Sequence, residues 1–547
     1  MALKKTTIAL ATAALISALV MSGCGRVEDP AQDPSSSEPT VADTASTPPT
    51  QDTNESIIVG TIDKVTAMDP AGSFDHASLM MHVHVYSFIY SFVPGQAAPQ
   101  LDAAESCDFV EPTVFECKIK DGMKFVNGHD LTSSDVKFTF DRQMAINDPN
   151  GPASLLGNLA SIDAPDAKTV RFNLKAANDQ TFMQVLATSV GPIVDEESFP
   201  ADKLISDEDI VAAKAFSGPY TVTSYAKNDS VEFAPNPDYI GVLPKPVNSG
   251  ITQKTFTDAT NLKLSISNGD IDVAYRSLTP TDIESLQADP NVKVWSEKGG
   301  EIRYIVFNMN TMPGDDDAQK FAIRQAMAAS VDRQALSDQV YKGQYLPLCS
   351  YVPDGFVGAT TAVCDNYGST PDKAKAEKYL TDAGVKTPVT LNIQYNPDHY
   401  GSSSDQEYGL IKQQLESTGL FTVNLQSTEW VTYNKERVAD TYPIYQLGWF
   451  PDYPDADNYL TPFFGTDNFL ENHFSNADID SMITAQVSEV DAAKRTDIIK
   501  NIQETMAAKH LSTLPLLQGS QWAVSRAEVT GVSLTVSECL FYGTLTR

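Results

Sequence analysis

A tryptophan and an aspartate lie close together where an apolar, aromatic segment ends. Residues 442–449 are typical of a buried strand, and Pro451 and Pro454 follow on either side of Asp452. A buried strand that runs into a proline-containing turn is a common place for a ligand pocket to open. A carboxylate that such a pocket shields from water can pair with the ammonium group of a ligand. The alternative is an ordinary exposed loop with solvated carboxylates.

The elements before this turn predict an α/β arrangement. A capped helix is expected at residues 370–384, followed by a strand at 389–395 and a helix at 406–418. A strand at 423–426 then completes a β-α-β crossover, which implies parallel pairing. The strand at 442–449 should lie beside these two strands and so position the turn.

The turn has a recognisable pattern. Gly448-Trp449-x-x-Asp452-Tyr453 resembles the Gly-Trp-x-x-Asp-Tyr/Asn motif of oligopeptide- and dipeptide-binding proteins. These belong to the peptide/nickel-type family (family 5) of extracytoplasmic solute-binding proteins of ABC transporters. The resemblance implies that Asp452 receives the amino terminus of a peptide. It covers nearly all of the chain after the leader.

The same resemblance suggests further ligand-binding residues. Trp430 and Arg437 stand at the spacings of a pocket tryptophan and a pocket arginine in the family, and Arg437 would meet a peptide carboxylate. The alternative for Arg437 is a surface position on a helix. Ser73, Phe74 and Asp75 follow the first strand, where family members contact the ligand, but an ordinary loop is an equal alternative.

A second segment resembles the family signature without suggesting a binding role. A strand at residues 117–125 leads through Asn127-Gly128 to Leu131-Thr132-Ser133-Ser134-Asp135-Val136. Thr132 and Asp135 have the spacing of a capping box, so a helix should begin there and continue to Gln143. The Asp135 carboxylate is therefore assigned to the start of a helix.

Composition and length limit the possible classes of protein. The chain has 547 residues, more than one hydrophobic core usually supports, so two or three domains are expected. Its 39 Lys and Arg against 71 Asp and Glu give a formal charge of −32. This acidity speaks against nucleic acid or an anionic membrane as a partner of the protein body.

The first residues predict export and lipid anchoring. Two lysines and an apolar run at 8–21 form a leader, and Ser22-Gly23-Cys24 resembles a bacterial lipobox, which implies a lipid on Cys24. The alternative is a plain signal peptide with a chance cysteine. The polar, acidic residues 24–56 should be a flexible tether, which favours the outer face of a Gram-positive membrane. A Gram-negative outer-membrane lipoprotein is the alternative.

The resemblance implies a two-lobed periplasmic-binding-protein type II fold of the α/β class, with an additional third domain. Strand residues 302–308 should cross between the lobes. The expected parts are a leader at 1–23, a tether at 24–56, lobe I at 57–82, 214–303 and 511–547, the third domain at 83–213 and lobe II at 304–510.

The cysteines predict two local disulfides. Cys107 and Cys117 flank a short hairpin, and Cys349 and Cys364 close a loop that contains proline and glycine. This pairing would leave Cys539 as a buried thiol outside both pairs.

The seven histidines show no metal-ligand spacing, and His82 and His84 on a helix expected at 77–92 would point away from each other, so no metal site is expected.

Two classes of function follow. A secreted lipoprotein hydrolase would need a nucleophile motif or a metal motif, and the chain has no G-x-S-x-G, H-E-x-x-H or glycine-rich phosphate loop. A non-enzymatic binding protein that closes on oligopeptides and delivers them to the permease and ATPase of an ABC importer is favoured. Oligosaccharides or a metal chelate are alternative ligands on this scaffold. We expect a monomer without a cofactor.

Overall fold

The computed structural model describes residues 55–96, 98–401, 403–535 and 539–547. The predicted leader, the lipidation position Cys24 and the tether up to residue 54 lie outside the described residues. Within the described part of the chain, no helix has the length and apolar character that crossing a membrane requires.

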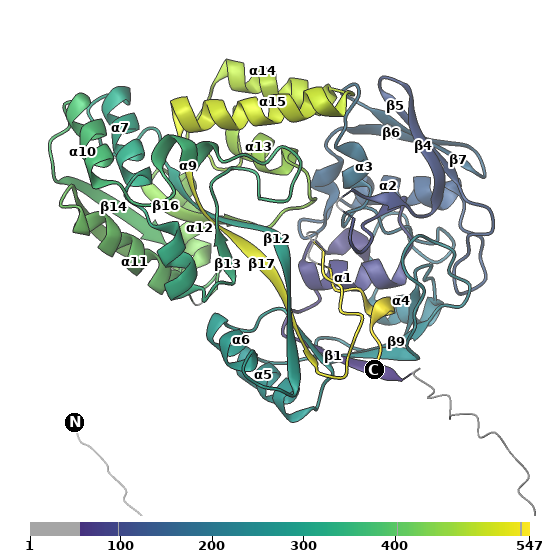
Figure 1. Ribbon diagram of the computed structural model, residues 1–547. Coiled ribbons are helices and arrows are strands. Elements are labelled where there is room, and N and C mark those ends of the chain that lie inside the picture. Colours follow the sequence, from purple (N-terminus) through teal and green to yellow (C-terminus); the bar gives the residue numbers. More distant parts are fainter. Residues whose placement is uncertain (1–54, 97, 402, 536–538) are drawn as a thin grey trace, which may run out of the picture. The chain divides into compact units, whose positions relative to one another are not determined.

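An 11-stranded sheet forms the backbone of the fold, and two long strands run through its middle (Figure 1). Its order is β15 (Phe421–Ser427), β14 (Val389–Tyr395), β16 (Ile444–Trp449), β12 (Val292–Phe307), β17 (Thr513–Arg526), β11 (Val273–Tyr275), β1 (Ser56–Thr61), β10 (Gly250–Thr255), β9 (Ser230–Pro235) and β8 (Tyr220–Ala226), with β13 (Tyr345–Pro347) paired to β17.

The long strands β12 and β17 belong to both halves of the sheet. They pair antiparallel from Val292 opposite Arg526 to Val306 opposite Thr513. The first half of this ribbon lies beside β11, and the second half lies beside β16. The predicted crossing strand is therefore real but starts earlier than residue 302. The polar residues 296–298 and two glycines interrupt its apolar pattern, and the pairing register shifts there.

Three large hydrophobic clusters divide the described residues. We call the cluster around β1, β8, β9, β10 and β11 lobe I, and the cluster around β14, β15, β16 and the second half of β12 lobe II. The third cluster packs under a separate sheet of order β4 (Ala104–Glu111), β5 (Val114–Ile119), β7 (Thr169–Leu174) and β6 (Leu159–Asp166). The predicted domain boundaries stay predictions, and Ile210, inside the range predicted for the third domain, packs in lobe I.

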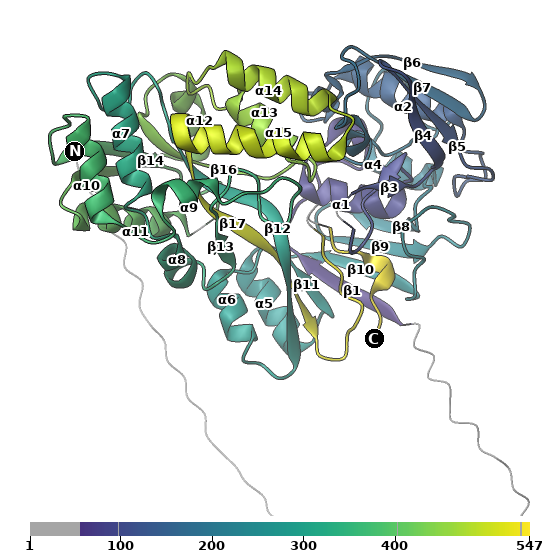
Figure 2. The same cartoon turned by 45° about the horizontal axis from the view of Figure 1, so that its top comes forward.

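Helices cover these sheets (Figure 2). Lobe I and its surroundings carry α1 (His76–Val85), α4 (Asp207–Ala213), α5 (Ala259–Asn268) and α6 (Pro280–Leu286). The third cluster holds α2 (Ser133–Ile146) and α3 (Phe182–Val185). Lobe II carries α7 (Asp317–Ala328), α8 (Arg333–Ala335), α9 (Ala362–Tyr367), α10 (Lys373–Asp382), α11 (Ser404–Ser417), α12 (Trp430–Val438), α13 (Asp457–Phe464), α14 (Ala477–Ser488) and α15 (Ala492–Thr505).

The β-α-β unit before the turn forms as predicted. Strands β14 and β15 pair parallel around α11, and β16 pairs parallel with β14. Helix α2 begins with the predicted capping box of Thr132 and Asp135. Helix α1, in contrast, ends at Val85 rather than at residue 92, because the chain then becomes extended and β2 (Tyr90–Ser91) pairs with β3 (Gln100–Leu101).

The structure pairs Cys107 with Cys117 and Cys349 with Cys364. The first pair joins directly opposite residues of β4 and β5, with their Cα atoms 4.1 Å apart. The second pair closes the loop before α9, with a Cα separation of 5.1 Å. Cys539 is buried in the lobe I cluster and takes part in neither disulfide.

Candidate functional site

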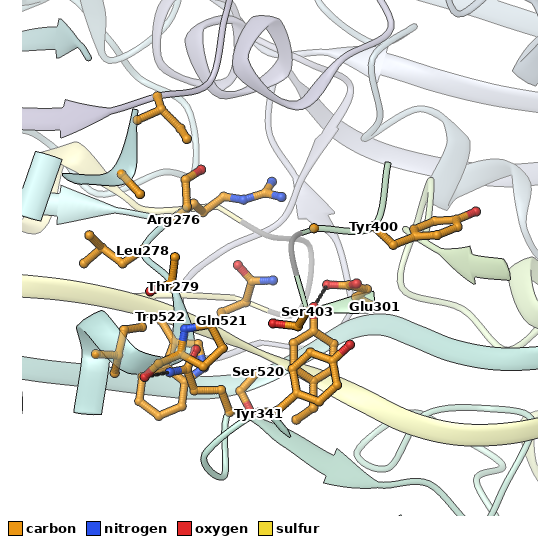
Figure 3. A pocket seen from close by; sticks show the side chains of 18 of the residues that line it. Arg276, Leu278, Thr279, Glu301, Tyr341, Tyr400, Ser403, Ser520, Gln521 and Trp522 are labelled. Carbon is orange, nitrogen blue, oxygen red and sulfur yellow. Dashed lines mark hydrogen bonds between the residues drawn. The ribbon is translucent and has the colours of Figure 1, made fainter. Parts of the chain in front are cut away.

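A cavity of about 560 Å³ lies between the two lobes, on one side of the long strands. We call it the interlobe cavity. Lobe I lines it with residues that follow β11, including Arg276 and Thr279. Lobe II lines it with Glu301, Tyr345 and Tyr400, among others, and Figure 3 labels several of the lining residues from both lobes. A cavity between two lobes is suited to a ligand that touches both.

The lobe I wall has an unusual backbone conformation. Arg276 and Ser277 have φ values of 57° and 65°, in the left-handed region that residues with a side chain rarely adopt. Asp63 fixes this turn, because its carboxylate accepts a hydrogen bond of 3.0 Å from the Ser277 hydroxyl and lies 3.7 Å from Arg276 Nε. Burial raises the pKa of Asp63, but the nearby Arg276 and His76 outweigh burial and hold that pKa well below its usual range.

The lobe II wall contains a buried ion pair. Arg303 Nη2 lies 2.7 Å from Glu301 Oε1 and donates to the Tyr345 hydroxyl over 3.1 Å. That hydroxyl in turn donates to Glu301 Oε2 over 2.8 Å. The Arg303 guanidinium also lies 5.4 Å from the ring centre of Tyr345 and 5.0 Å from that of Tyr400. Two aromatic rings and one carboxylate therefore hold this arginine in place.

Asp452 lies on the turn after β16, at a second and smaller cavity of about 40 Å³. The other walls of this cavity are mostly apolar and include Leu79 and Val83 of α1. Asn458 Nδ2 donates to Asp452 Oδ2 over 3.2 Å. Burial raises the pKa of Asp452, and the hydrogen bond from Asn458 opposes this rise only in part. Among the described residues, no lysine, arginine or histidine comes within ion-pair distance of Asp452.

Gly448 and Trp449 point to opposite faces of β16, as successive strand residues do. A Cβ atom at Gly448 would lie 2.9 Å from the ring of Tyr400, so this position faces the interlobe cavity and has no room for a side chain. Trp449 instead packs against Phe463 and Phe469, and its Nε1 donates to Asn458 Oδ1 over 3.0 Å.

Trp430 and Arg437 both lie on α12 of lobe II. The Trp430 indole stacks on His399, which lines the interlobe cavity, with ring centres 3.8 Å apart. Arg437 is only 3% exposed, so it is not a surface arginine. Its Nε donates to Asn434 over 2.7 Å, and its Nη1 lies 3.3 Å from the Leu470 carbonyl oxygen. These contacts tie α12 to the segment after α13.

The remaining predicted residues have structural contacts. Ser73 is buried and donates to the Asp69 carbonyl, Asp75 caps α1, and Phe74 is 42% exposed. None of these three lines the interlobe cavity or the cavity at Asp452. Tyr453 is buried in the third cluster, and its hydroxyl donates to Asp457 over 3.2 Å. The turn after β16 therefore reaches across to the third cluster.

The sequence-based reasoning missed several residues of the interlobe cavity. Glu301 and Arg303 are two residues apart on β12 and therefore share one face, whereas the residues between and after them are apolar. Two alternating charged residues within an otherwise apolar strand were a detectable signal, because buried charges are rare. Arg276 and Tyr400 had no comparable local signal.

Comparisons with known proteins agree with this architecture. The model of "Bacterial extracellular solute-binding proteins, family 5 Middle" matches residues 98–471. Among curated proteins, a "Di/tripeptide-binding protein 1" of Pseudomonas aeruginosa is 26% identical over 450 residues, which covers 77% of this chain and 81% of that protein.

Solved structures share the fold. HbpA2 from Haemophilus parasuis superposes with a TM-score of 0.78 at 19% identity, over 90% of this chain and 99% of that one. A dipeptide-binding protein from Pseudoalteromonas sp. SM9913, in complex with Met-Leu, gives a TM-score of 0.70 at 20% identity, over 90% of this chain and 100% of that one. The predicted fold class is thereby confirmed.

Proposed function

The chain belongs to family 5 of the bacterial extracellular solute-binding proteins, and we propose that it captures oligopeptides and delivers them to an ABC importer. A relative named as a di/tripeptide-binding protein supports a peptide as the ligand. Binding without chemical turnover is the activity that such a protein performs.

One observation supports a peptide above all. Asp452 is a carboxylate at a mostly apolar cavity, and its side chain has Asn458 as its polar contact but no cation among the described residues. A cavity of about 40 Å³ has room for a small group such as an ammonium. A ligand that brings a free α-ammonium would supply the missing positive charge, and its own charge would be stabilised where water is excluded.

The long strands support capture by closure. Because β12 and β17 each pair with strands of both lobes, a small change of twist in this ribbon would rotate one lobe against the other. A ligand in the interlobe cavity contacts both lobes and therefore favours the closed form by its differential contacts. Saturating peptide should then lower the radius of gyration measured by small-angle scattering and raise the melting temperature.

Binding of mixed tripeptides tests the proposal directly. We expect titration calorimetry to detect binding of an equimolar tripeptide library with free amino termini. The N-acetylated library should bind at least a hundredfold more weakly, because breaking a buried ion pair costs about 3–5 kcal/mol. Asp452→Asn should weaken binding of the free library similarly, and the two losses should not add, as expected for coupled groups. Equal binding of both libraries to the unmodified protein would contradict an amino-terminal site.

The choice of control variant follows from the structure. Asp455 and Asp457 are unsuitable, because Asp455 forms two hydrogen bonds to the Arg495 guanidinium and Asp457 is buried among hydrogen-bond donors. Asp467 is exposed on the segment after α13, so Asp467→Asn should leave the preference for free amino termini unchanged.

Anchoring to the membrane is part of the proposal. Cys24 directly follows the leader, and acylation of its thiol would hold the protein at the outer face of the cell membrane. The acidic residues after Cys24 would give the protein body reach toward the permease. Cys24→Ser should release the protein from the membrane fraction, and unchanged retention would contradict the lipid anchor.

A further inference from the structure

Arg303 is a buried arginine with unused hydrogen-bond donors. It is 4% exposed, and its Nη2 contacts Glu301 and Tyr345, but its Nε and Nη1 have no hydrogen-bond partner among the described residues. Arg142, which is equally buried, donates from all three nitrogens to Asp69 and to backbone carbonyls. Buried donors without acceptors are rare, so the donors of Arg303 point to a missing acceptor.

The position of Arg303 distinguishes it from other arginines. Arg333 also has nitrogens without partners, but it does not line the interlobe cavity, whereas Arg303 does. Arg437 uses its guanidinium within lobe II, where it contacts Asn434 and the segment after α13. Arg276 lies on the opposite wall, beside Asp63.

The charge around Arg303 is balanced without a ligand. Burial would lower the pKa of Arg303, but the adjacent Glu301 carboxylate outweighs burial and raises it, so the guanidinium stays charged. Glu407 lies nearby, is 1% exposed and accepts a hydrogen bond of 2.8 Å from Tyr341, and burial raises its pKa. Glu301 is thus the main competitor for any anionic group that approaches Arg303.

We propose that Arg303 receives the carboxylate terminus of a short peptide and that Glu301 limits how tightly this carboxylate is held. The inference rests on the proposed function, because it takes a peptide as the ligand. The carboxylate would accept hydrogen bonds from the unused donors of Arg303 after a small rearrangement of the surrounding side chains, and such charge-assisted bonds are strong.

The strand pairing brings Arg303 and the turn that carries Asp452 into the same region of the protein. Arg303 pairs with Gly448 across β12 and β16, and Asp452 follows Gly448 by four residues. Four residues span at most about 14 Å, so the backbone of Asp452 lies no farther than this from that of Gly448. Phe450 lines the interlobe cavity and Asp452 lines the smaller one, so one turn contributes to both.

The test compares an equimolar tripeptide library with its C-terminally amidated form by calorimetry. In the unmodified protein we expect amidation to weaken binding about tenfold to a hundredfold, as expected for a lost hydrogen bond to a charged group. In the double variant Glu301→Gln/Arg303→Met, which removes both charges of the ion pair, the free-acid and amidated libraries should bind about equally. The preference for free over N-acetylated amino termini should persist in that variant.

Two single variants sharpen the test. Glu301→Gln keeps Arg303 but removes the competing negative charge, so it should strengthen binding of the free-acid library and leave the amidated library unchanged. A purely structural ion pair predicts no such gain. Arg276→Met is the matched control, because Arg276 lines the same cavity, and it should keep the discrimination.

The outcomes separate this inference from the proposed function. If the free-acid and amidated libraries bind equally to the unmodified protein, the assignment of Arg303 fails while peptide binding stands. If Arg276→Met abolishes the preference for the free-acid library and the double variant does not, the carboxylate is bound by Arg276 of lobe I and the assignment to Arg303 is overturned. If neither library binds, the proposed function itself fails, and this inference fails with it.

Discussion

Asn458 fixes Asp452 through two hydrogen bonds. Asn458 Nδ2 donates to Asp452 Oδ2 over 3.2 Å, and Asn458 Oδ1 accepts from the Asp452 backbone N–H over 2.9 Å. The same Oδ1 accepts from Trp449 Nε1 over 3.0 Å. One buried amide on α13 thus orients both the carboxylate and the tryptophan of the turn after β16.

Asn458→Ala should loosen this turn and weaken peptide binding. We expect about tenfold weaker binding of tripeptides with free amino termini, because one buried hydrogen bond to the charged carboxylate is lost. The loss should be much smaller for N-acetylated tripeptides, and calorimetry with both libraries measures the difference. Asn434→Ala removes the amide that contacts Arg437 instead and serves as the control. Equal losses for both libraries would mean that Asn458 acts only on stability.

Gly300 is expected to be essential for the position of the same turn. A Cβ atom there would lie 2.5 Å from Pro451 Cγ and 2.8 Å from the Tyr459 hydroxyl oxygen. Gly300→Ala should therefore displace Pro451 and lower the free energy of unfolding by about 1–3 kcal/mol, as overpacking does. Peptide affinity should fall as well, because Pro451 directly precedes Asp452. Thermal unfolding and calorimetry measure the two effects.

A second glycine provides the contrast. A Cβ atom at Gly409 on α11 would meet no atom within 4 Å. Gly409→Ala should leave peptide affinity unchanged and raise stability by about 0.5–1 kcal/mol, since alanine favours a helix over glycine. If Gly300→Ala left peptide affinity and stability as high as Gly409→Ala does, the close approach of Gly300 to Pro451 would not matter for binding.

Acid should destabilise the contact between α1 and the C-terminal segment. His84 is 2% exposed, stacks on Tyr542 and accepts a hydrogen bond from the Tyr542 backbone N–H. Burial lowers the pKa of His84 to about 4, from 6.5. Because His84 binds a proton more weakly in the folded state than in the unfolded state, its neutral form contributes to stability above pH 6.5. This contribution is lost as the pH falls toward 4. The loss at pH 4 is about 3 kcal/mol at most.

His84→Phe should therefore flatten the loss of stability between pH 7 and pH 4.5, measured by urea unfolding at each pH. The variant also loses the acceptor for the Tyr542 N–H, so its stability at pH 7 should fall. The decisive quantity is the change of the free energy of unfolding with pH. His129 is the control, because its hydrogen bond to Asp195 raises its pKa. His129→Asn should not reduce acid sensitivity. An unchanged slope in His84→Phe would contradict the role of His84.

The two disulfides should contribute unequally. The pair Cys349 and Cys364 closes a loop with a sequence separation of 15, so replacing both by alanine should lower the free energy of unfolding by about 2–4 kcal/mol. Cys107 and Cys117 are already held opposite each other by the pairing of β4 and β5. Replacing Cys107 and Cys117 by alanine should therefore lower the free energy of unfolding by less. Urea unfolding compares the variants, and a larger loss of stability on replacing Cys107 and Cys117 would contradict this ordering.

Local sequence patterns were sufficient for several elements and for the place of the turn. The spacing of Thr132 and Asp135 predicts the capping box that opens α2, because capping depends on residues only three positions apart. The alternation and crossover at residues 389–449 predict parallel strands, since a β-α-β unit is determined by short connections. The end of α1 was missed, because the extended chain after Val85 is held by contacts with distant residues.

The chemistry of the cavity depended on tertiary structure. Arg437 has the sequence spacing of a pocket arginine, but folding buries its guanidinium among Asn434 and the segment after α13. Arg303 carries no motif, yet the pairing of β12 with β16 places it in the interlobe cavity with donors that lack acceptors. The sequence alone determined which residues are charged and the approximate place of several helices and strands. Only long-range packing decided which of those charges face the interlobe cavity, because the direction of a side chain and its partners come from segments far apart in the chain.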